Sequence, residues 1–261
     1  MGKLTGKVAV VTGAGRGIGR AIAVAYAAEG AKVVVASRTA ATVISVVKEI
    51  ETAGGTALGV TCDVAQREQV FAMIEQAAQT FGSIDILVNN AQGFGKEGAL
   101  THAPVYVPIQ DFDEEILEFT FRSGFMSTLW AMKAAFPHLS KHGGKIINFG
   151  SPQAQINLEG GMAYNMTKEA VRSLSRTAAR EWGPLNINVN VINPIMLTEA
   201  LQEAYETAPT SFDGTIAQVP LRRFGNPEKD CAPVAIFLAS SESDFVTGMT
   251  MQVDGGFFMR A

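Results

Sequence analysis

The chain has 261 residues and a formal net charge of −4; 47% of its residues are hydrophobic and 18% are charged. This length and apolar content suit one α/β domain with a large core. The low charge and the lack of a basic cluster argue against nucleic acid as a partner, and no apolar run is long enough to span a membrane. Cys62 and Cys231 make no disulfide framework and are expected to pack as small apolar residues. Met1–Lys7 is too short and polar for a signal peptide, so we expect a cytoplasmic protein.

Apolar runs of strand length alternate along the chain with stretches of helical pattern. The expected strands are Val8–Val11, Lys32–Ala36, Ala57–Thr61, Ile84–Val88, Lys145–Phe149, Asn188–Ile192 and Met249–Val253. The expected helices are Ala21–Ala28, Thr42–Ala53, Arg67–Phe81, Gly124–His138, Ala163–Trp182 and Asp230–Ser240. Continuously apolar strands that alternate with helices indicate a parallel sheet covered on both faces. We therefore predict one doubly wound α/β domain over residues 1–261, with a seven-stranded, mostly parallel sheet.

A glycine-rich segment, Thr12–Gly19, follows the first expected strand and precedes the first expected helix. A strand, a glycine turn and a helix in this order form the setting in which a dinucleotide binds. The glycines let the backbone approach a pyrophosphate, and the helix N-terminus supplies N–H groups and the positive end of its dipole. The alternative is a tight strand-to-helix turn without a ligand. With the glycine turn, the predicted domain is of the Rossmann type.

Tyr164 and Lys168 are four residues apart in an expected helix and therefore share one of its faces. A tyrosine titrates near pH 10 when unperturbed, which makes it a poor acid–base catalyst at neutral pH. An ammonium group beside the phenol favours the phenolate and is expected to lower the tyrosine pKa. The alternative is a chance pairing on a solvated helix.

Together these motifs resemble the short-chain dehydrogenase/reductase family, in its classical branch, over nearly the whole chain. The matching segments are the loop Thr12–Gly19, Asp63 as the adenine-contacting aspartate, Asn89–Ala91, Ser151 as the catalytic serine, Tyr164 with Lys168, and Asn193–Pro194 with Thr198 over the nicotinamide. The resemblance implies Ser151, Tyr164 and Lys168 as catalytic residues. The residues expected to bind the cofactor are Gly13, Gly15, Arg16, Gly17, Ile18, Gly19, Ser37, Arg38, Asp63, Val64, Asn90, Ala91, Tyr164, Lys168, Pro194 and Thr198.

The implied reaction transfers a hydride between a nicotinamide and a carbon, while the protein handles the proton at the adjacent oxygen. Tyr164 would be the acid in reduction and the base in oxidation. Lys168 would lower the Tyr164 pKa and, by the resemblance, hydrogen-bond the nicotinamide ribose. Ser151 would hold the substrate oxygen; its alternative role is that of a turn former beside Pro152.

Cofactor preference is predicted from the end of the second strand. An acidic residue there would bind both ribose hydroxyls and repel a 2′-phosphate, and none is present. Arg38 follows the strand instead, Arg16 lies in the glycine loop, and Ser37 adds a hydroxyl. An arginine offers a planar, charged fork for phosphate, so we predict NADP(H) over NAD(H). The alternative is that Arg38 stacks on adenine while Arg16 is solvated.

The chain departs from the family pattern at several positions. Gln92 and Ile195 each stand where a glycine is usual. Ile195 is β-branched, so a positive φ is not expected there, and its side chain is a candidate contact for the nicotinamide or the substrate. Many members also carry a fourth catalytic residue, an asparagine in the helix before Pro137. Counting back from Pro137 places Ser123 or Gly124 at that position, and the stretch 119–127 contains no asparagine. A water-based proton relay through that helix would have to use backbone carbonyls.

Two long segments, 92–111 and 195–224, follow strand ends and read as irregular loops of the substrate site; plain surface loops are the alternative. The candidate substrate walls are Phe94, Tyr106, Met162, Ile195, Met196, Leu197, Leu201 and Phe212. These side chains are mostly apolar, so we predict an uncharged, mostly apolar ketone or secondary alcohol, which a cyclic compound would satisfy. Arg222 and Arg223 leave a reductase of acyl thioesters, of the 3-oxoacyl or enoyl type, as an alternative. Enoyl reductases, however, typically place tyrosine and lysine more than four residues apart.

A nucleotide-binding regulator without turnover is a further alternative, because fold alone does not define function. His102, His138 and His142 show no metal-ligand spacing, so we predict no metal site.

The helices Gly124–Leu139 and Ala163–Trp182 are apolar on more than one side, through Phe125, Leu129, Trp130, Phe136, Val171, Leu174 and Ala178. Family members commonly pair these helices, so we predict a symmetric homo-oligomer, a tetramer or a dimer.

Overall fold

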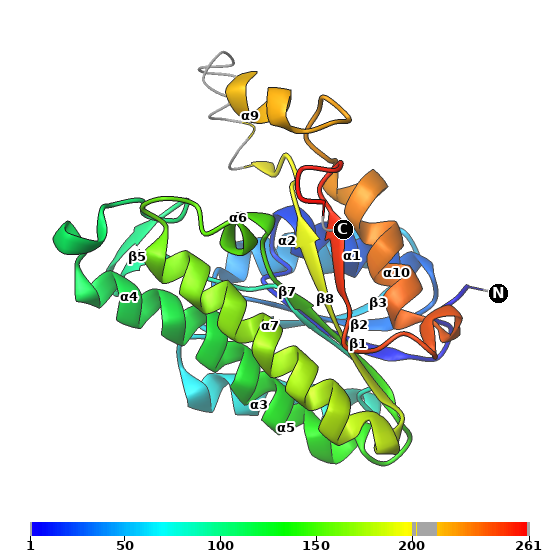
Figure 1. Ribbon diagram of the computed structural model, residues 1–261. Helices are drawn as coiled ribbons and strands as arrows, with labels where there is room; N and C mark the ends of the chain where they lie inside the picture. The colour runs from blue at the N-terminus through cyan, green and yellow to red at the C-terminus, as the bar shows by residue number, and fades with distance from the viewer. Residues whose placement is uncertain (1, 200–201, 203–212, 260–261) are drawn as a thin grey trace.

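A parallel β-sheet runs through the centre of the computed structural model, which describes residues 2–199, 202 and 213–259 (Figure 1). The strands of this sheet are β1 (Val8–Thr12), β2 (Lys32–Ser37), β3 (Thr56–Thr61), β4 (Ile86–Asn89), β7 (Gly144–Phe149), β8 (Ile187–Pro194) and β9 (Thr250–Val253). In the described part of the chain the sheet has seven strands in the order β3-β2-β1-β4-β7-β8-β9, and each neighbouring pair is parallel. The strand order reverses between β1 and β4, which is the place where open α/β sheets bind ligands.

Helices cover both faces of the sheet (Figure 1). The helices α1 (Gly17–Ala28), α2 (Ala40–Thr52) and α10 (Ala232–Ala239) pack on one face, and α3 (Arg67–Phe81), α5 (Ser127–Leu139) and α7 (Met162–Trp182) pack on the other. In β2, Val33 and Val35 join the core on the first face, whereas Val34 and Ala36 join the core on the second. Successive side chains of a strand point to opposite faces, so a strand buried on both faces is apolar throughout. The predicted Rossmann-type doubly wound fold is confirmed.

The predicted strands are all present, and the predicted helix Arg67–Phe81 coincides with α3. Both cysteines are buried and free, as expected. Across the described residues, no helix is both long and apolar enough to cross a membrane.

The helix predicted over Gly124–His138 is the second half of a longer continuous helix that begins at Glu114. Helix α4 (Glu114–Phe121) leads through a π-helical turn, Arg122–Met126, directly into α5. The start of α4 is set by Asp113, whose carboxylate accepts a hydrogen bond of 3.0 Å from the Glu115 backbone N–H. Gly124, at which the predicted helix began, lies inside the π-helical turn. A glycine inside a continuous helix was mistaken for its boundary, because glycine usually interrupts helices.

The prediction of an irregular segment over 92–111 is wrong in part. The strands β5 (Phe94–Lys96) and β6 (Ala99–Thr101) form an antiparallel hairpin within it. The hairpin is fixed to the start of α4, because the Lys96 ammonium pairs with the carboxylates of Asp113 and Glu115. In the segment 195–224, the structure describes a helix, α9 (Asp213–Gln218).

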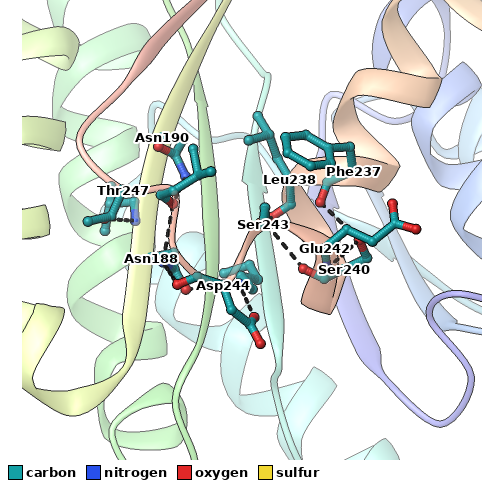
Figure 2. A network of polar contacts seen from close by, with 12 residues as sticks. Asn188, Asn190, Phe237, Leu238, Ser240, Glu242, Ser243, Asp244 and Thr247 are labelled. Carbon is teal, nitrogen blue, oxygen red and sulfur yellow. Dashed lines mark hydrogen bonds and ion pairs between the residues drawn. The ribbon is translucent and has the colours of Figure 1, made fainter.

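A polar network at the amino end of β8 holds the last part of the chain in place (Figure 2). The Asn188 amide donates hydrogen bonds to the backbone carbonyls of Asp244 and Val246, at 3.0 and 3.1 Å. The Asn190 amide donates to the Val246 carbonyl as well, and the Val189 N–H donates to the Thr247 hydroxyl. These bonds guide the chain into β9, whose far end reaches the carboxyl edge of the sheet.

Candidate active site

A cavity of about 610 Å³ opens at the carboxyl ends of the strands, at the reversal of strand order. Of the residues predicted to bind the cofactor, those that line the cavity are Gly13, Arg16, Gly17, Ile18, Ser37, Arg38, Asp63, Val64, Asn90, Ala91, Tyr164, Lys168, Pro194 and Thr198. Gly15, Gly19 and Ser151 are buried beside it. Residues from distant parts of the chain therefore meet at one edge of the sheet, because parallel strands present all their carboxyl ends there.

The glycine loop needs its glycines for two different reasons. Gly13 and Gly17 have φ values of 68° and 57°, a region that other residues rarely adopt. Gly19 is close to other backbone, because a Cβ there would overlap the Gly13 carbonyl and lie 2.6 Å from the Asn90 amide nitrogen. The loop thus forms a cradle of bare backbone at the start of α1, and its shape fits the pyrophosphate of a dinucleotide.

Hydrogen bonds between Thr12 and Asn90 hold the glycine loop against the end of β4. The Thr12 hydroxyl accepts hydrogen bonds from the backbone N–H groups of Asn90 and Ala91, at 3.1 and 3.2 Å. The Asn90 amide in turn donates to the Thr12 carbonyl at 3.0 Å. These reciprocal bonds connect the ends of β1 and β4, so the cradle is part of the rigid sheet.

The start of α1 already holds an anionic group. The Gly17 N–H donates a hydrogen bond of 2.7 Å to the Glu199 carboxylate. The N-terminus of a helix favours anions, because its N–H groups lack partners within the helix and its dipole is positive there. The carboxylate oxygen thus marks a position that suits a phosphate oxygen.

Arg16 and Arg38 lie exposed at the far end of the cavity, near Ser37. Within the described residues, neither arginine forms an ion pair. Thr39 and Thr42 line the same end, and no carboxylate follows β2. This end of the cavity is therefore rich in hydrogen-bond donors and positively charged.

Tyr164 and Lys168 lie in the first turns of α7 and face the same cavity. The Lys168 ammonium is 5.7 Å from the centre of the Tyr164 ring. It donates a hydrogen bond of 3.0 Å to the Phe149 carbonyl at the end of β7. The lysine is 7% exposed, so its charge has been brought into the protein against a cost in hydration.

Burial dominates the pKa values of this pair. It raises the pKa of Tyr164 to about 12, although the side-chain hydrogen bond with Ser151 acts in the opposite direction. Burial also lowers the pKa of Lys168 to about 7. The expectation that Lys168 lowers the Tyr164 pKa is thus not met in this structure, because the loss of hydration of the phenol is the larger effect. At neutral pH the tyrosine is a protonated phenol, the form that donates a proton.

Ser151 combines both of the roles considered for it. Its hydroxyl accepts a hydrogen bond of 3.2 Å from the Gln153 N–H and so caps the short helix α6 (Pro152–Gln155). The same side chain forms the hydrogen bond that acts on the Tyr164 pKa. The turn holds the serine in place at the end of β7, beside the phenol.

The β5–β6 hairpin, which the sequence did not reveal, forms a wall of the cavity. Its contributors and their neighbours are Gln92, Gly93, Phe94, Leu100, Thr101, His102, Phe119 and Ser123. The Phe94 ring packs edge-on against Tyr164, with ring centres 5.8 Å apart. His102, to which the sequence assigned no role in the site, lines the cavity too. A strand pair of three residues each is too short to show a period in the sequence.

The other candidate substrate walls have different surroundings. Met196 packs in the core and is 7% exposed, which corrects its assignment as a wall. The Tyr106 hydroxyl donates a hydrogen bond of 3.0 Å to the Gln153 side chain. Leu201 and Phe212 lie outside the described residues. Ile195 has no positive φ, as expected, and it does not line the cavity; nor do Met162 and Leu197.

Comparisons with known proteins agree with this architecture. A family model described as enoyl-(acyl carrier protein) reductase matches residues 13–258. A 12α-hydroxysteroid dehydrogenase from a Clostridium species is 33% identical and covers 100% of both chains. The 2-dehydro-3-deoxy-D-gluconate 5-dehydrogenase of Escherichia coli is 34% identical, over 98% of this chain and 97% of the relative. A solved structure from Sinorhizobium meliloti, named as a short-chain alcohol dehydrogenase, superimposes with a TM-score of 0.89 at 32% identity, over 98% of this chain and 97% of that one.

A Rossmann-type sheet with a glycine cradle and a Tyr–Lys pair at its carboxyl edge defines a nicotinamide-dependent oxidoreductase. The chain belongs to the short-chain dehydrogenase/reductase family, in its classical branch. Its members use a nicotinamide nucleotide, and the cradle of this chain fits that group.

Proposed function

We propose that this protein interconverts a mostly apolar ketone and its secondary alcohol with NADP(H), and that Tyr164 is the general acid and base. One observation carries the proposal: Tyr164 and Lys168 line the same cavity as the glycine cradle. A protein that only bound a nucleotide would have no need of a proton donor beside that site.

When bound, the cofactor supplies or accepts the hydride at the substrate carbon. In reduction, the Tyr164 phenol donates its proton to the carbonyl oxygen, and in oxidation the phenolate removes it. The Ser151 hydroxyl donates a hydrogen bond to the same oxygen and stabilises its developing charge. Lys168, anchored on the Phe149 carbonyl, places a positive charge beside the tyrosine. Because burial raises the pKa of Tyr164 to about 12, the phenol is in its protonated form at neutral pH.

The preference for NADP(H) is supported by Arg16 and Arg38. Both are exposed at the end of the cavity next to Ser37, and the absence of a carboxylate after β2 leaves nothing there to repel a 2′-phosphate. An arginine binds phosphate with a planar fork of donors.

The preference for an apolar carbonyl compound is supported by Phe94, which packs against Tyr164 where the substrate must approach. The relative that acts on a hydroxysteroid supports a cyclic secondary alcohol, whereas the sugar-acid relative is a reason to test polar substrates too. The description of the matching family model favours acyl thioesters as a second candidate. Against this candidate, Arg223 is paired with Asp230 at 2.7 Å, so its charge is already neutralised.

The catalytic role is tested by Tyr164→Phe, assayed by nicotinamide absorbance against cyclic ketones, polyols, sugar acids and acyl thioesters. We expect the variant to bind cofactor normally and to lose at least about 100-fold in turnover, since acid–base catalysis supplies roughly 10²–10⁴-fold. Arg176→Ala, at an exposed position of α7, serves as the control. Turnover above about a tenth of the wild-type rate in Tyr164→Phe would contradict the assignment. A kinetic preference for polyols or sugar acids would contradict the substrate class.

The cofactor preference is tested by Arg38→Ala, with kcat/KM measured for both cofactors. We expect the preference for NADPH over NADH to fall by at least about tenfold, because a charge-assisted contact to the 2′-phosphate is lost. Arg176→Ala, at an exposed position of α7, is the matched control. Equal use of both cofactors by the wild type, unchanged in Arg38→Ala, would show that NADP(H) is not preferred.

A further inference from the structure

Gln92, where the chain departs from its family, lies against Gly124, one of the two candidates for the position of the missing asparagine. A Cβ atom at Gly124 would lie 3.1 Å from both Cδ and Nε2 of Gln92, and it would overlap the Thr167 methyl group. The Gln92 carboxamide and the Thr167 methyl therefore occupy the space that a side chain at 124 would take. An amide is thus present at this place, but it comes from the loop after β4 and not from the helix.

The position of Gln92 is fixed by the residue that follows it. The Gly93 N–H donates a hydrogen bond of 3.1 Å to the Ser123 hydroxyl, and this hydroxyl donates at 3.2 Å to the Gly93 carbonyl. A Cβ on Gly93 would lie 2.7 Å from the Phe119 ring, so the loop is in close contact with the helix. Ser123 belongs to the π-helical turn Arg122–Met126, and such turns frequently occur at functional sites.

The Gln92 amide has no partner that would explain its burial. Its nitrogen and its oxygen are both buried, and neither makes a hydrogen bond with any described residue. Buried side-chain amides are normally paired with protein or with ordered water. Gln92 lines the same cavity as Tyr164 and Lys168, so a rotation of its side chain would bring the unpaired amide to groups in that cavity.

The Lys168 ammonium, in the same cavity, has fewer hydrogen-bond acceptors than it has donors. The only bond that its ammonium makes with the described residues goes to the Phe149 carbonyl, although an ammonium has three donors. The Thr167 methyl group lies beside Gly124, as the Gln92 carboxamide does. Thr167 directly precedes Lys168 in the helix. A carbonyl oxygen that accepted from this ammonium would favour its charged form.

We propose that Gln92 is a positioning residue for Lys168: its amide oxygen accepts a hydrogen bond from the Lys168 ammonium, directly or through one water. The bond keeps Lys168 charged and oriented beside Tyr164 during turnover. This inference rests on the proposed function, because it assigns Lys168 a role in the reaction.

The test compares Gln92→Met and Gln92→Glu with the wild type through kcat, KM, cofactor affinity and the pH profile of kcat. Methionine keeps the length of the side chain and removes the acceptor. We expect Gln92→Met to lower kcat by at least about tenfold, with KM and cofactor affinity nearly unchanged, and to move the basic limb of the profile to lower pH. Gln92→Glu keeps an acceptor and adds a negative charge, so its basic limb should move to higher pH. Gln76→Met, at an exposed glutamine of α3, is the matched control.

Unchanged kcat and an unchanged pH profile in Gln92→Met would overturn the inference and leave Gln92 as a space-filling residue. A rise in KM alone would overturn it as well and assign Gln92 to substrate binding. If Gln92→Met does not fold, Gln92→Gly answers the same question, because glycine is the usual family residue there. Tyr164→Phe is measured in parallel: activity in that variant refutes the proposed function, whereas an inactive Tyr164→Phe beside a fully active Gln92→Met refutes the inference alone.

Discussion

At the scale of single residues, the cavity places a lysine where its charge is costly. Lys168 is almost fully buried, and burial lowers its pKa to about 7 from an ordinary value of 10.5. The nearby phenol is held in its neutral form by the same loss of hydration. The role proposed for Lys168 therefore requires a group that reduces the stability of the fold, as is common at active sites.

Because burying the Lys168 charge is costly, replacement of Lys168 should change how the free energy of unfolding depends on pH. Between pH 7 and 10.5 the unfolded chain holds a proton that the folded lysine has released, so this group's contribution to the free energy of unfolding rises with pH. Below pH 7 both states are protonated, and the folded state bears the whole cost of the buried charge. We expect Lys168→Met to be more stable than the wild type below pH 7, with a difference that shrinks toward pH 10.5.

Denaturant unfolding across this pH range measures the effect, and Lys133→Met, at an exposed position of α5, is the control. A difference between Lys168→Met and the wild type that did not vary with pH would contradict the prediction.

At the scale of elements, the start of α1 couples the cofactor site to the chain after β8. The Glu199 carboxylate accepts a hydrogen bond from the Gly17 N–H, and both residues line the cavity. A phosphate group that takes the same donor must displace the carboxylate and is repelled by its charge.

Removal of this carboxylate should strengthen cofactor binding. We expect Glu199→Ala to lower the Kd for NADPH by about threefold or more, because the helix N-terminus no longer has a competing anion. Fluorescence titration of the free enzyme gives the Kd directly, and Glu181→Ala at an exposed site near the end of α7 is the control. A weaker Kd in Glu199→Ala would mean that Glu199 supports the bound state and does not compete with it.

At the scale of the whole molecule, α7 and the continuous helix formed by α4, the π-helical turn and α5 keep apolar side chains partly exposed. Phe125 pairs with Phe121 and Phe136 pairs with Trp182, at ring-centre distances of 4.8 and 4.9 Å; all four rings remain partly accessible. Val171 and Ala178, by contrast, pack into the core of the chain itself, which removes them from the predicted contact surface. The remaining apolar surface on these helices is suited to contact with a second copy.

The oligomeric state is predicted accordingly. We expect a symmetric tetramer at micromolar concentration, with a mass of four times 27.7 kDa, because paired helices would cover the partly exposed rings. Sedimentation equilibrium measures the mass. A dimer would mean that two copies pair about a single two-fold axis. A monomer at 27.7 kDa would refute the prediction.

The sequence alone predicted those features that depend on neighbours in the chain. The seven strands and the helix Arg67–Phe81 follow from hydrophobic periodicity over a few residues. The glycine loop Thr12–Gly19 was visible for the same reason, because its shape needs residues without a Cβ at particular places in one short turn. The pair Tyr164 and Lys168 was visible because helical spacing by itself puts both on one face.

The features that depend on contacts between distant segments of the chain were determined by the tertiary structure alone. The Glu114 start of α4, the β5–β6 hairpin and its place beside Tyr164 arise from packing that no local pattern records. The Gln92 amide lies against Gly124 although the two residues are far apart in the chain. The pKa of Tyr164 was expected to fall because of its neighbour Lys168, and it rises to about 12 because burial depends on the whole fold. Spacing along a helix shows which groups meet, whereas the water that they lose on folding decides how they titrate.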